Sequence, residues 1–274
     1  MKISIDSASN YRKIEGIDYS IAPLSINTNE REFIDDESFN VNEMLDYLEH
    51  TKLSSRSACP GINDWYKTYG DEKEVIVIAL ASALSGSYNS AKTAADEWLE
   101  NHPDSKIFLL DTTAIGPVEK LCVEYIIENK DKMSFEELTK SLDEYCHKNT
   151  KIGFCLKSLK NLANNGRINP AVAKIAETLK IHIVGDFTVE GILDPKDKVR
   201  GGKKAMETLY KNMLDAGYKG GKLRIDHVLA PESANELANI VRADFPQADI
   251  IIDDTTALCS FYAQRGGLVI GYER

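Results

Sequence analysis

Residues 75–99 combine three features that together predict a strand followed directly by a helix. The apolar run at residues 75–78 is typical of a buried strand, and a serine-rich stretch at residues 82–90 follows it. Apolar and small side chains then recur at helical spacing, at Tyr88, Ala91, Ala94, Ala95, Trp98 and Leu99. A buried strand that turns directly into an amphipathic helix is the repeating unit of an α/β fold.

Ser85 lies in the turn where this helix is expected to begin. A serine in that position usually caps the helix, because its oxygen accepts a hydrogen bond from a backbone N–H two or three residues further on. The start of a helix also carries unpaired N–H groups and the positive end of the helix dipole, which suit an anion. We expect the cap, and capping does not exclude a ligand role because the hydroxyl hydrogen can still donate.

The first 150 residues alternate strand-like runs with helical patterns. The runs lie at residues 2–5, 20–26, 75–80 and 106–110, and helical patterns fall between and after them, with a capping box at Ser134 and Glu137. Strands that alternate with helices predict a parallel sheet covered by helices, here a three-layer α/β/α domain over residues 1–150.

Residues 151–274 contain more strands with shorter connections. Candidate strands lie at residues 151–156, 181–187, 191–193, 223–229, 250–253 and 268–272. Six strands with helices among them predict a two-layer α/β domain with a mixed six-stranded sheet. Residues 187–192 have the pattern of a hairpin, because Gly191 can supply the positive φ of a tight turn.

Composition excludes several classes of function. The 274 residues are 43% apolar and 28% charged, and no apolar run is long enough to span a bilayer. The net charge of −10 opposes nucleic-acid binding. Five widely spaced cysteines and unclustered histidines predict reduced thiols and no metal site. Because residues 1–6 have the pattern of a strand and not of a signal peptide, we expect a cytoplasmic protein that is not integral to a membrane.

Hydroxyl-rich segments follow the four N-terminal strands, and ligands bind at the carboxyl ends of strands in parallel sheets. These segments are residues 6–9, 23–25, 82–87 and 111–117. Ser57, in a loop fixed by Pro60 and Gly61, and Arg167, on a turn beside Gly166, are further candidates. Simpler interpretations stay open for each of them: a helix cap, a turn, or an ordinary surface arginine.

The sequence gives little support for a hydrolase or a nucleotide-binding enzyme. There is no Gly-x-Ser-x-Gly motif, and none of the five histidines is paired by spacing with a candidate serine. Residues 200–204 lack the glycine spacing of a phosphate loop and are expected to begin an exposed helix. The open alternative is a phosphotransferase or hydrolase that uses Asp6 or Asp111 as acid or base, although such carboxylates more often cap turns.

Taken in order along almost the whole chain, the motifs resemble those of the DegV family. The family consists of fatty-acid-binding proteins that, in bacterial fatty acid kinase systems, present the lipid to a kinase subunit. The matching segments are residues 6–9, 23–24, 84–91, 166–168 and 198–205.

The resemblance implies a parallel α/β domain followed by a second α/β domain, with a long-chain fatty acid buried in a tunnel between and within them. It implies that Ser57 and Ser85 hold the carboxylate. Ser7, Gly86, Ser87 and Thr112, from the hydroxyl-rich segments at the strand ends, complete the predicted binding set. Arg167 would lie near the carboxylate and matter when a phosphoryl group arrives. The chain itself would perform no chemistry and need no cofactor, because a partner kinase would form the acyl-phosphate.

Two departures from the family pattern carry consequences. The Thr-Ser-x-Pro loop of the family is Ser57-Ala58-Cys59-Pro60 here, which keeps only its first hydroxyl. The family's C-terminal His-Thr-Gly-Pro-Gly segment is missing, and by alignment Glu273 falls near the place of its histidine. A carboxylate there would repel the ligand's carboxylate unless one of the two were protonated or Arg167 or Arg274 intervened. Lipid binding with impaired phosphorylation, or divergence to a different ligand, is therefore a further alternative.

Overall fold

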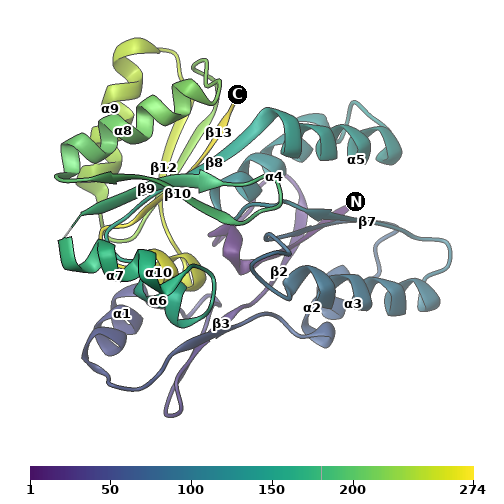
Figure 1. Ribbon diagram of the computed structural model, residues 1–274. Coiled ribbons are helices and arrows are strands. Elements are labelled where there is room, and N and C mark those ends of the chain that lie inside the picture. Colours follow the sequence, from purple (N-terminus) through teal and green to yellow (C-terminus); the bar gives the residue numbers. More distant parts are fainter. Residues whose placement is uncertain (180) are drawn as a thin grey trace.

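The computed structural model describes residues 1–179 and 181–274. Within that part of the chain, the first half forms a four-stranded sheet in the order β2-β1-β6-β7 (Figure 1). Its strands are β1 (Lys2–Asp6), β2 (Asp18–Ala22), β6 (Glu74–Ala79) and β7 (Lys106–Asp111). Each neighbouring pair is parallel, as predicted, so the carboxyl ends of all four strands meet at one edge.

The second half contributes a mixed six-stranded sheet among the described residues, which confirms the predicted fold class. Its order is β10-β9-β8-β13-β11-β12, and every neighbouring pair is antiparallel except β11 with β12. The strands are β8 (Thr150–Leu156), β9 (His182–Phe187), β10 (Leu193–Val199), β11 (Leu223–His227), β12 (Ile250–Asp254) and β13 (Leu268–Glu273). The predicted hairpin joins β9 to β10, with Gly191 at φ +80.

The structure contains a small third sheet that the sequence pattern does not predict. β3 (Ser25–Asn27) lies between β4 (Glu32–Ile34) and β5 (Arg56–Ala58), with both pairs antiparallel. The single strand expected at residues 20–26 is wrong: β2 ends before Pro23, which has no N–H to donate, and the Leu24 N–H bonds instead to the Ser7 Oγ, 3.0 Å away. This sheet holds Ser57 on β5, opposite Ile26.

Helices cover the outer faces of both main sheets. α2 and α3 pack together against one face of the four-stranded sheet, and α8 and α9 cover one face of the six-stranded sheet (Figure 1). The predicted capping box of α5 is present, and the predicted helix after residues 200–201 is α8. The helices are α1 (Val41–His50), α2 (Ile62–Tyr69), α3 (Ser87–Asn101), α4 (Pro117–Asn129), α5 (Phe135–Glu144), α6 (Lys160–Asn164), α7 (Pro170–Leu179), α8 (Gly202–Asp215), α9 (Pro231–Asp244) and α10 (Ala257–Ala263).

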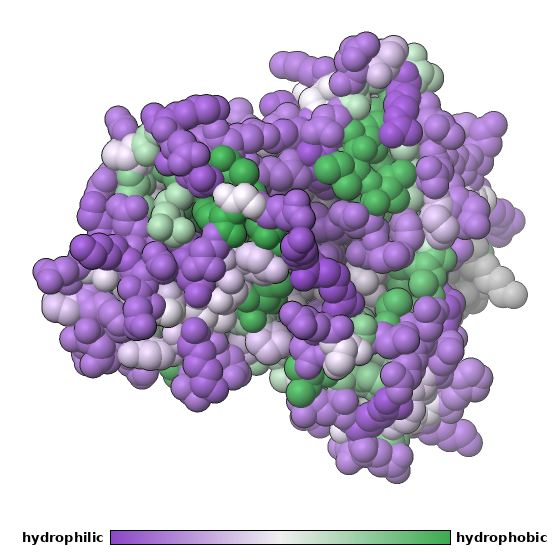
Figure 2. All heavy atoms as spheres, turned by 180° about the vertical axis from the view of Figure 1, so that it is seen from behind, coloured by the Kyte–Doolittle hydropathy of each residue, from purple (hydrophilic) through white to green (hydrophobic). Residues whose placement is uncertain are grey.

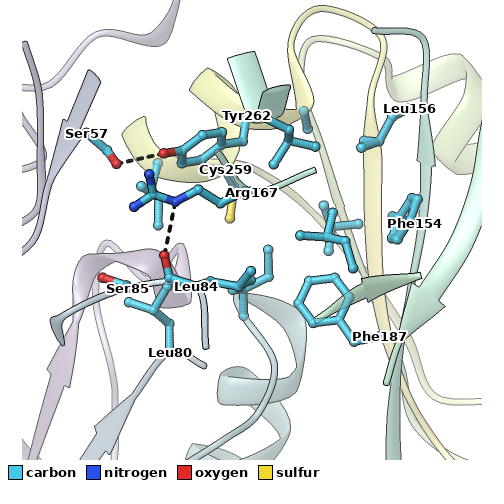
Figure 3. Close-up of a pocket in the computed structure, with 16 residues that line it drawn as sticks. Ser57, Leu80, Leu84, Ser85, Phe154, Leu156, Arg167, Phe187, Cys259 and Tyr262 are labelled. Atoms are coloured by element: carbon cyan, nitrogen blue, oxygen red, sulfur yellow. Dashed lines mark hydrogen bonds between the residues drawn. The ribbon is translucent and has the colours of Figure 1, made fainter. Parts of the chain in front are cut away.

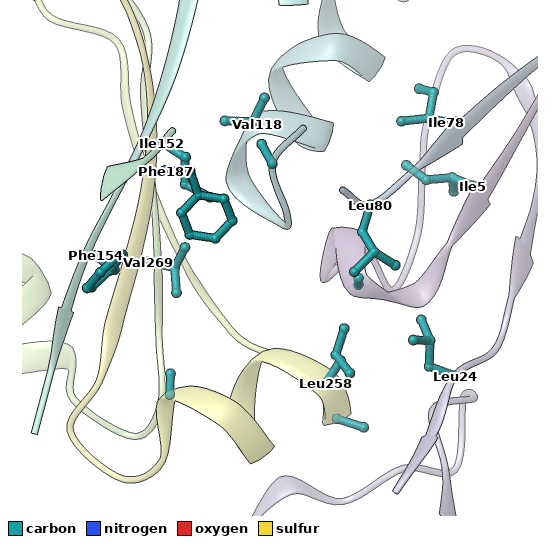
Figure 4. Packing of buried hydrophobic residues seen from close by; sticks show 14 of the residues in the cluster. Ile5, Leu24, Ile78, Leu80, Val118, Ile152, Phe154, Phe187, Leu258 and Val269 are labelled. Carbon is teal, nitrogen blue, oxygen red and sulfur yellow. The ribbon is translucent and has the colours of Figure 1, made fainter. Parts of the chain in front are cut away.

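The inner faces of the two main sheets share one hydrophobic core (Figure 4). Alternate residues of β6 divide between two environments: Val75 and Val77 pack with α2 and α3, whereas Ile76 and Ile78 face the shared core. Phe154 on β8 closes the opposite side of that core.

The division into domains at residues 150 and 151 stays a prediction, although the first strand of the six-stranded sheet in chain order, β8, begins at Thr150.

Helix α4 joins the two halves through close packing and a buried ion pair. At Gly271 on β13 a Cβ would lie 2.7 Å from the Pro117 carbonyl carbon, so only glycine admits this approach of the helix. The Lys120 Nζ lies 2.8 Å from Asp226 Oδ1 on β11 and 2.7 Å from Asp253 Oδ2 on β12. Lys120 and Asp226 are almost fully buried, and Asn10 donates a further hydrogen bond to Asp226.

The outer surface is largely polar. Figure 2 shows one face with hydrophilic side chains over most of its area and apolar side chains in a few separate patches. None of the helices in the described residues has the length and apolar character needed to cross a bilayer.

Replacing Lys120 by Met should lower the free energy of unfolding by about 3–5 kcal/mol, because it leaves the buried Asp226 carboxylate without a countercharge. Urea denaturation measures the change. The matched control is Lys148→Met, which removes the exposed Lys148–Glu144 pair and should leave the free energy of unfolding nearly unchanged, because water screens that pair. Equal losses in the two variants would contradict a stabilising role for the buried pair.

Candidate functional site

An apolar cavity lies inside the shared core, between the strand ends of the first sheet and the inner face of the second (Figure 3). The space between its walls, including that at its open end, is about 630 Å³. Its walls are aliphatic and aromatic side chains from both halves, among them Leu80, Ile115, Phe154, Leu156, Phe187, Leu258 and Val269.

Four polar side chains gather at one end of this cavity. Ser57, Ser85, Arg167 and Tyr262 line it there, while the rings of Phe154 and Phe187 lie at the opposite end (Figure 3). The structure therefore brings together the three residues that sequence reasoning placed nearest a carboxylate, although they come from β5, the β6–α3 turn and the α6–α7 turn. A cavity that is apolar along its length and polar at one end suits an amphipathic ligand.

Ser85 faces the cavity and accepts the backbone hydrogen bond expected of a cap, but it is not the helix cap: the N-cap of α3 is the next residue, Gly86, which has no side chain to cap with. The Ser85 Oγ accepts a hydrogen bond from the Ser87 N–H, 3.2 Å away, at the first turn of α3. Since the oxygen is used as an acceptor, the hydroxyl hydrogen of Ser85 is left to donate to a ligand. The bond from Ser87 and a ligand role for Ser85 are compatible in this geometry.

Arg167 carries a positive charge at the same end. The turn that bears it has Gly166 at φ +74, a conformation that favours glycine. The guanidinium donates to the backbone carbonyls of Leu84, 3.1 Å away, and Asn165, which fixes its plane beside Ser85. Within the side chains that the structure describes, no carboxylate forms an ion pair with Arg167, so its charge is available to an anion.

Four other predicted ligand residues do not line the cavity: Ser7, Ser87, Thr112 and Gly86. The Ser87 hydroxyl donates to Asp6 Oδ2 at 2.7 Å, the Ser7 Oγ accepts from the Leu24 N–H, and the Thr112 hydroxyl donates to the Ala79 carbonyl. All three are buried and serve the protein's own backbone and side chains. Gly86 lies outside the cavity, in an adjoining surface hollow that it shares with Ser85 and Arg167.

The two carboxylates of the enzymatic alternative hold loops in place. Asp111 Oδ1 accepts hydrogen bonds from the N–H groups of Ser82 and Thr113. Asp6 accepts from the Leu80 N–H at 3.1 Å as well as from Ser87, and burial raises its pKa to about 7. Neither side chain lines the cavity, and no cluster of metal-binding side chains is found within residues 1–179 and 181–274.

The predicted position of Glu273 is wrong. Its carboxylate accepts a hydrogen bond from the Tyr145 hydroxyl at 2.8 Å and from the Lys222 N–H at 3.0 Å, and it does not line the cavity. Glu273 is the last residue of β13, whose strand direction carries it away from the polar end. Glu273 therefore lies outside the cavity whose polar end is formed by Ser57, Ser85 and Arg167.

Tyr262 is the site residue that sequence reasoning missed. It lies on α10, lines the cavity, and its hydroxyl is 2.8 Å from the Ser57 Oγ. Its neighbours Phe261 and Ala263 are buried apolar residues, so the sequence pattern around it is that of an ordinary core helix. Only the tertiary contact across 205 positions of sequence distinguishes it.

Comparison with known proteins gives a consistent result. A family profile described as "Uncharacterised protein, DegV family" matches residues 1–274. A DegV domain-containing protein of Streptococcus pneumoniae is 35% identical over 277 residues, covering 99% of this chain and 98% of that protein.

Two solved structures are similar over the full length. A DegV family protein from Eubacterium eligens, loaded with heptadecanoic acid, has a TM-score of 0.96 and 37% identity, with 99% of each chain covered. The Streptococcus pneumoniae Fatty Acid Kinase (Fak) B3 protein, loaded with linoleic acid, has a TM-score of 0.96 and 35% identity, covering 99% of this chain and 98% of that one. The resemblance drawn from the motifs is confirmed.

The raised pKa of Asp6 predicts a pH-dependent stability. An aspartate that ionises near pH 4 when unfolded but only near pH 7 when folded makes the folded state less stable as pH rises between those values. Raising the pH from 5 to 8 should therefore destabilise the wild type by roughly 2 kcal/mol more than the Asp6→Asn variant. Urea denaturation of both proteins at the two pH values measures this, and parallel losses would contradict it.

Proposed function

The chain belongs to the DegV family, and we propose that it binds a long-chain fatty acid in the cavity, with the carboxylate at Ser57 and Ser85. The observation that carries the proposal is the polarity of the cavity: apolar walls along its length and hydroxyls with one guanidinium at a single end. Fatty acids bound in the Eubacterium eligens and Streptococcus pneumoniae structures support the same ligand class.

The two ends of the cavity would contribute differently to binding. Each methylene buried against the apolar walls adds roughly 0.8 kcal/mol before the costs of association, so the hydrocarbon chain supplies most of the affinity. A buried carboxylate is costly unless it is hydrogen-bonded, and the two serine hydroxyls with the Arg167 charge offset that cost. The polar end therefore selects the orientation of the ligand.

We further propose that the bound acid is presented to a partner kinase. The hollow outside the cavity shares Leu84, Ser85 and Arg167 with it, which would bring the carboxylate to the surface. There a carboxylate oxygen attacks the γ-phosphorus of ATP held by the kinase, forming the acyl-phosphate and releasing ADP. Arg167 would stabilise the added negative charge, and the use of ATP places this step in the cytoplasm.

Mass spectrometry of organic extracts of the purified protein tests the ligand class, and an acyl chain of fatty acid mass is expected. In titrations with oleate, the Ser57→Ala, Ser85→Ala double variant should bind roughly 100-fold more weakly, because two hydrogen bonds to a charged group are lost. Ser82→Ala, a hydroxyl in the adjoining hollow but outside the cavity, is the matched control and should bind normally.

Absence of any co-purified lipid, together with no uptake of added oleate or palmitate, would contradict fatty acid binding. If the double serine variant kept full affinity, the carboxylate would lie elsewhere, and divergence to a different ligand would be favoured.

Arg167→Gln should separate binding from presentation. Oleate affinity should fall less than about tenfold, since both serines remain, whereas acyl-phosphate formation by a fatty acid kinase should slow by about 100-fold or more because charge on the transferring phosphoryl group is no longer stabilised. Coupled ADP release at saturating oleate measures the rate. Equal effects on affinity and rate would assign Arg167 to binding alone.

A further inference from the structure

We propose that Tyr262 orients the hydroxyl hydrogen of Ser57 toward the ligand's carboxylate and so makes the site selective for an ionised acid. This inference rests on the proposed function and adds a positioning residue to it. The structural basis is the 2.8 Å contact between the Tyr262 hydroxyl and the Ser57 Oγ at the polar end of the cavity (Figure 3).

Both partners of this contact are held by separate elements. Ser57 lies on β5, whose pairing with β3 places it opposite Ile26. Tyr262 lies on α10, and the Asn161 side-chain amide holds that helix by donating to the Phe261 carbonyl at 2.8 Å. The hydroxyl pair therefore joins the first half of the chain to the second directly at the ligand-binding end.

The direction of the hydrogen bond follows from the chemistry of the two hydroxyls. Each has one hydrogen to donate and lone pairs to accept. A phenol is a better donor and a poorer acceptor than an aliphatic alcohol, because its oxygen lone pair is delocalised into the ring. Tyr262 therefore donates and Ser57 accepts, which leaves the Ser57 hydrogen free for the ligand and strengthens it as a donor.

Ser85 has the same arrangement with a different donor. Its oxygen accepts from the Ser87 N–H at 3.2 Å, so its own hydrogen is also free. Each serine thus accepts from the protein and can donate into the cavity. A carboxylate is acceptor-only and matches two outward donors, whereas an alcohol headgroup can donate as well as accept and gains less from this preset direction.

The test is Tyr262→Phe, which keeps the ring that contacts Phe261 and removes only the hydroxyl. Oleate affinity should fall about tenfold, while affinity for oleyl alcohol should change less than about twofold. Tyr210→Phe is the matched control, because it removes a tyrosine hydroxyl bonded to Asp244 and lies outside the cavity, and it should leave both affinities unchanged.

A double-mutant cycle with Ser57→Ala establishes whether Tyr262 acts through Ser57. In the Ser57→Ala background, Tyr262→Phe should reduce oleate affinity by less than about twofold further. Additive losses would mean that Tyr262 contacts the ligand independently, and equal losses for oleate and oleyl alcohol would mean that it is only part of the wall; either result overturns the proposal. Failure of the proposed function is distinct, because the wild type would then bind no oleate.

Discussion

The hydrophobic core shared by the two main sheets is the constraint on which the rest of the structure depends. β6 directs Ile76 and Ile78 into this core, and β8 closes it with Phe154 from the other side. The cavity is the part of the core that side chains leave unfilled. Because dense packing is the norm for protein interiors, an apolar space of this kind indicates a place for a ligand's hydrocarbon chain. The buried Lys120–Asp226 ion pair, between α4 and β11, also holds the first half of the chain against the second.

The polar side chains that line the cavity lie at one of its ends. The carboxyl ends of parallel strands meet there, and the start of α3 adds Ser85 to the same edge. Ser57 and Tyr262 arrive from a small sheet and a short helix that the main layers do not include. Each serine oxygen is occupied by a donor of the protein itself, which leaves two hydroxyl hydrogens and the Arg167 charge facing the cavity. The arrangement gives an amphipathic ligand one favourable orientation.

The sequence pattern predicts correctly those elements whose structure depends on residues close together in the chain. Residues 75–99 predict β6 and α3, because an apolar run and helical spacing act over short distances, whereas the cap expected at Ser85 falls on Gly86 instead. The three-residue strand β5 carries no such signal, and Ser57 was found only through its loop motif. Tyr262 could not be found, because its contact with Ser57 depends on how the two halves pack. The position expected for Glu273 is wrong because alignment with the family's C-terminal segment does not show how far β13 runs beyond the cavity.

A crystal structure of the protein soaked or co-purified with oleate would show directly where the carboxylate and the acyl chain lie. We expect one carboxylate oxygen within hydrogen-bond distance of the Ser57 and Ser85 hydroxyls and an acyl chain that runs between the sheets toward Phe154. A carboxylate at the Phe154 end, or a lipid bound outside the shared core, would contradict this expectation.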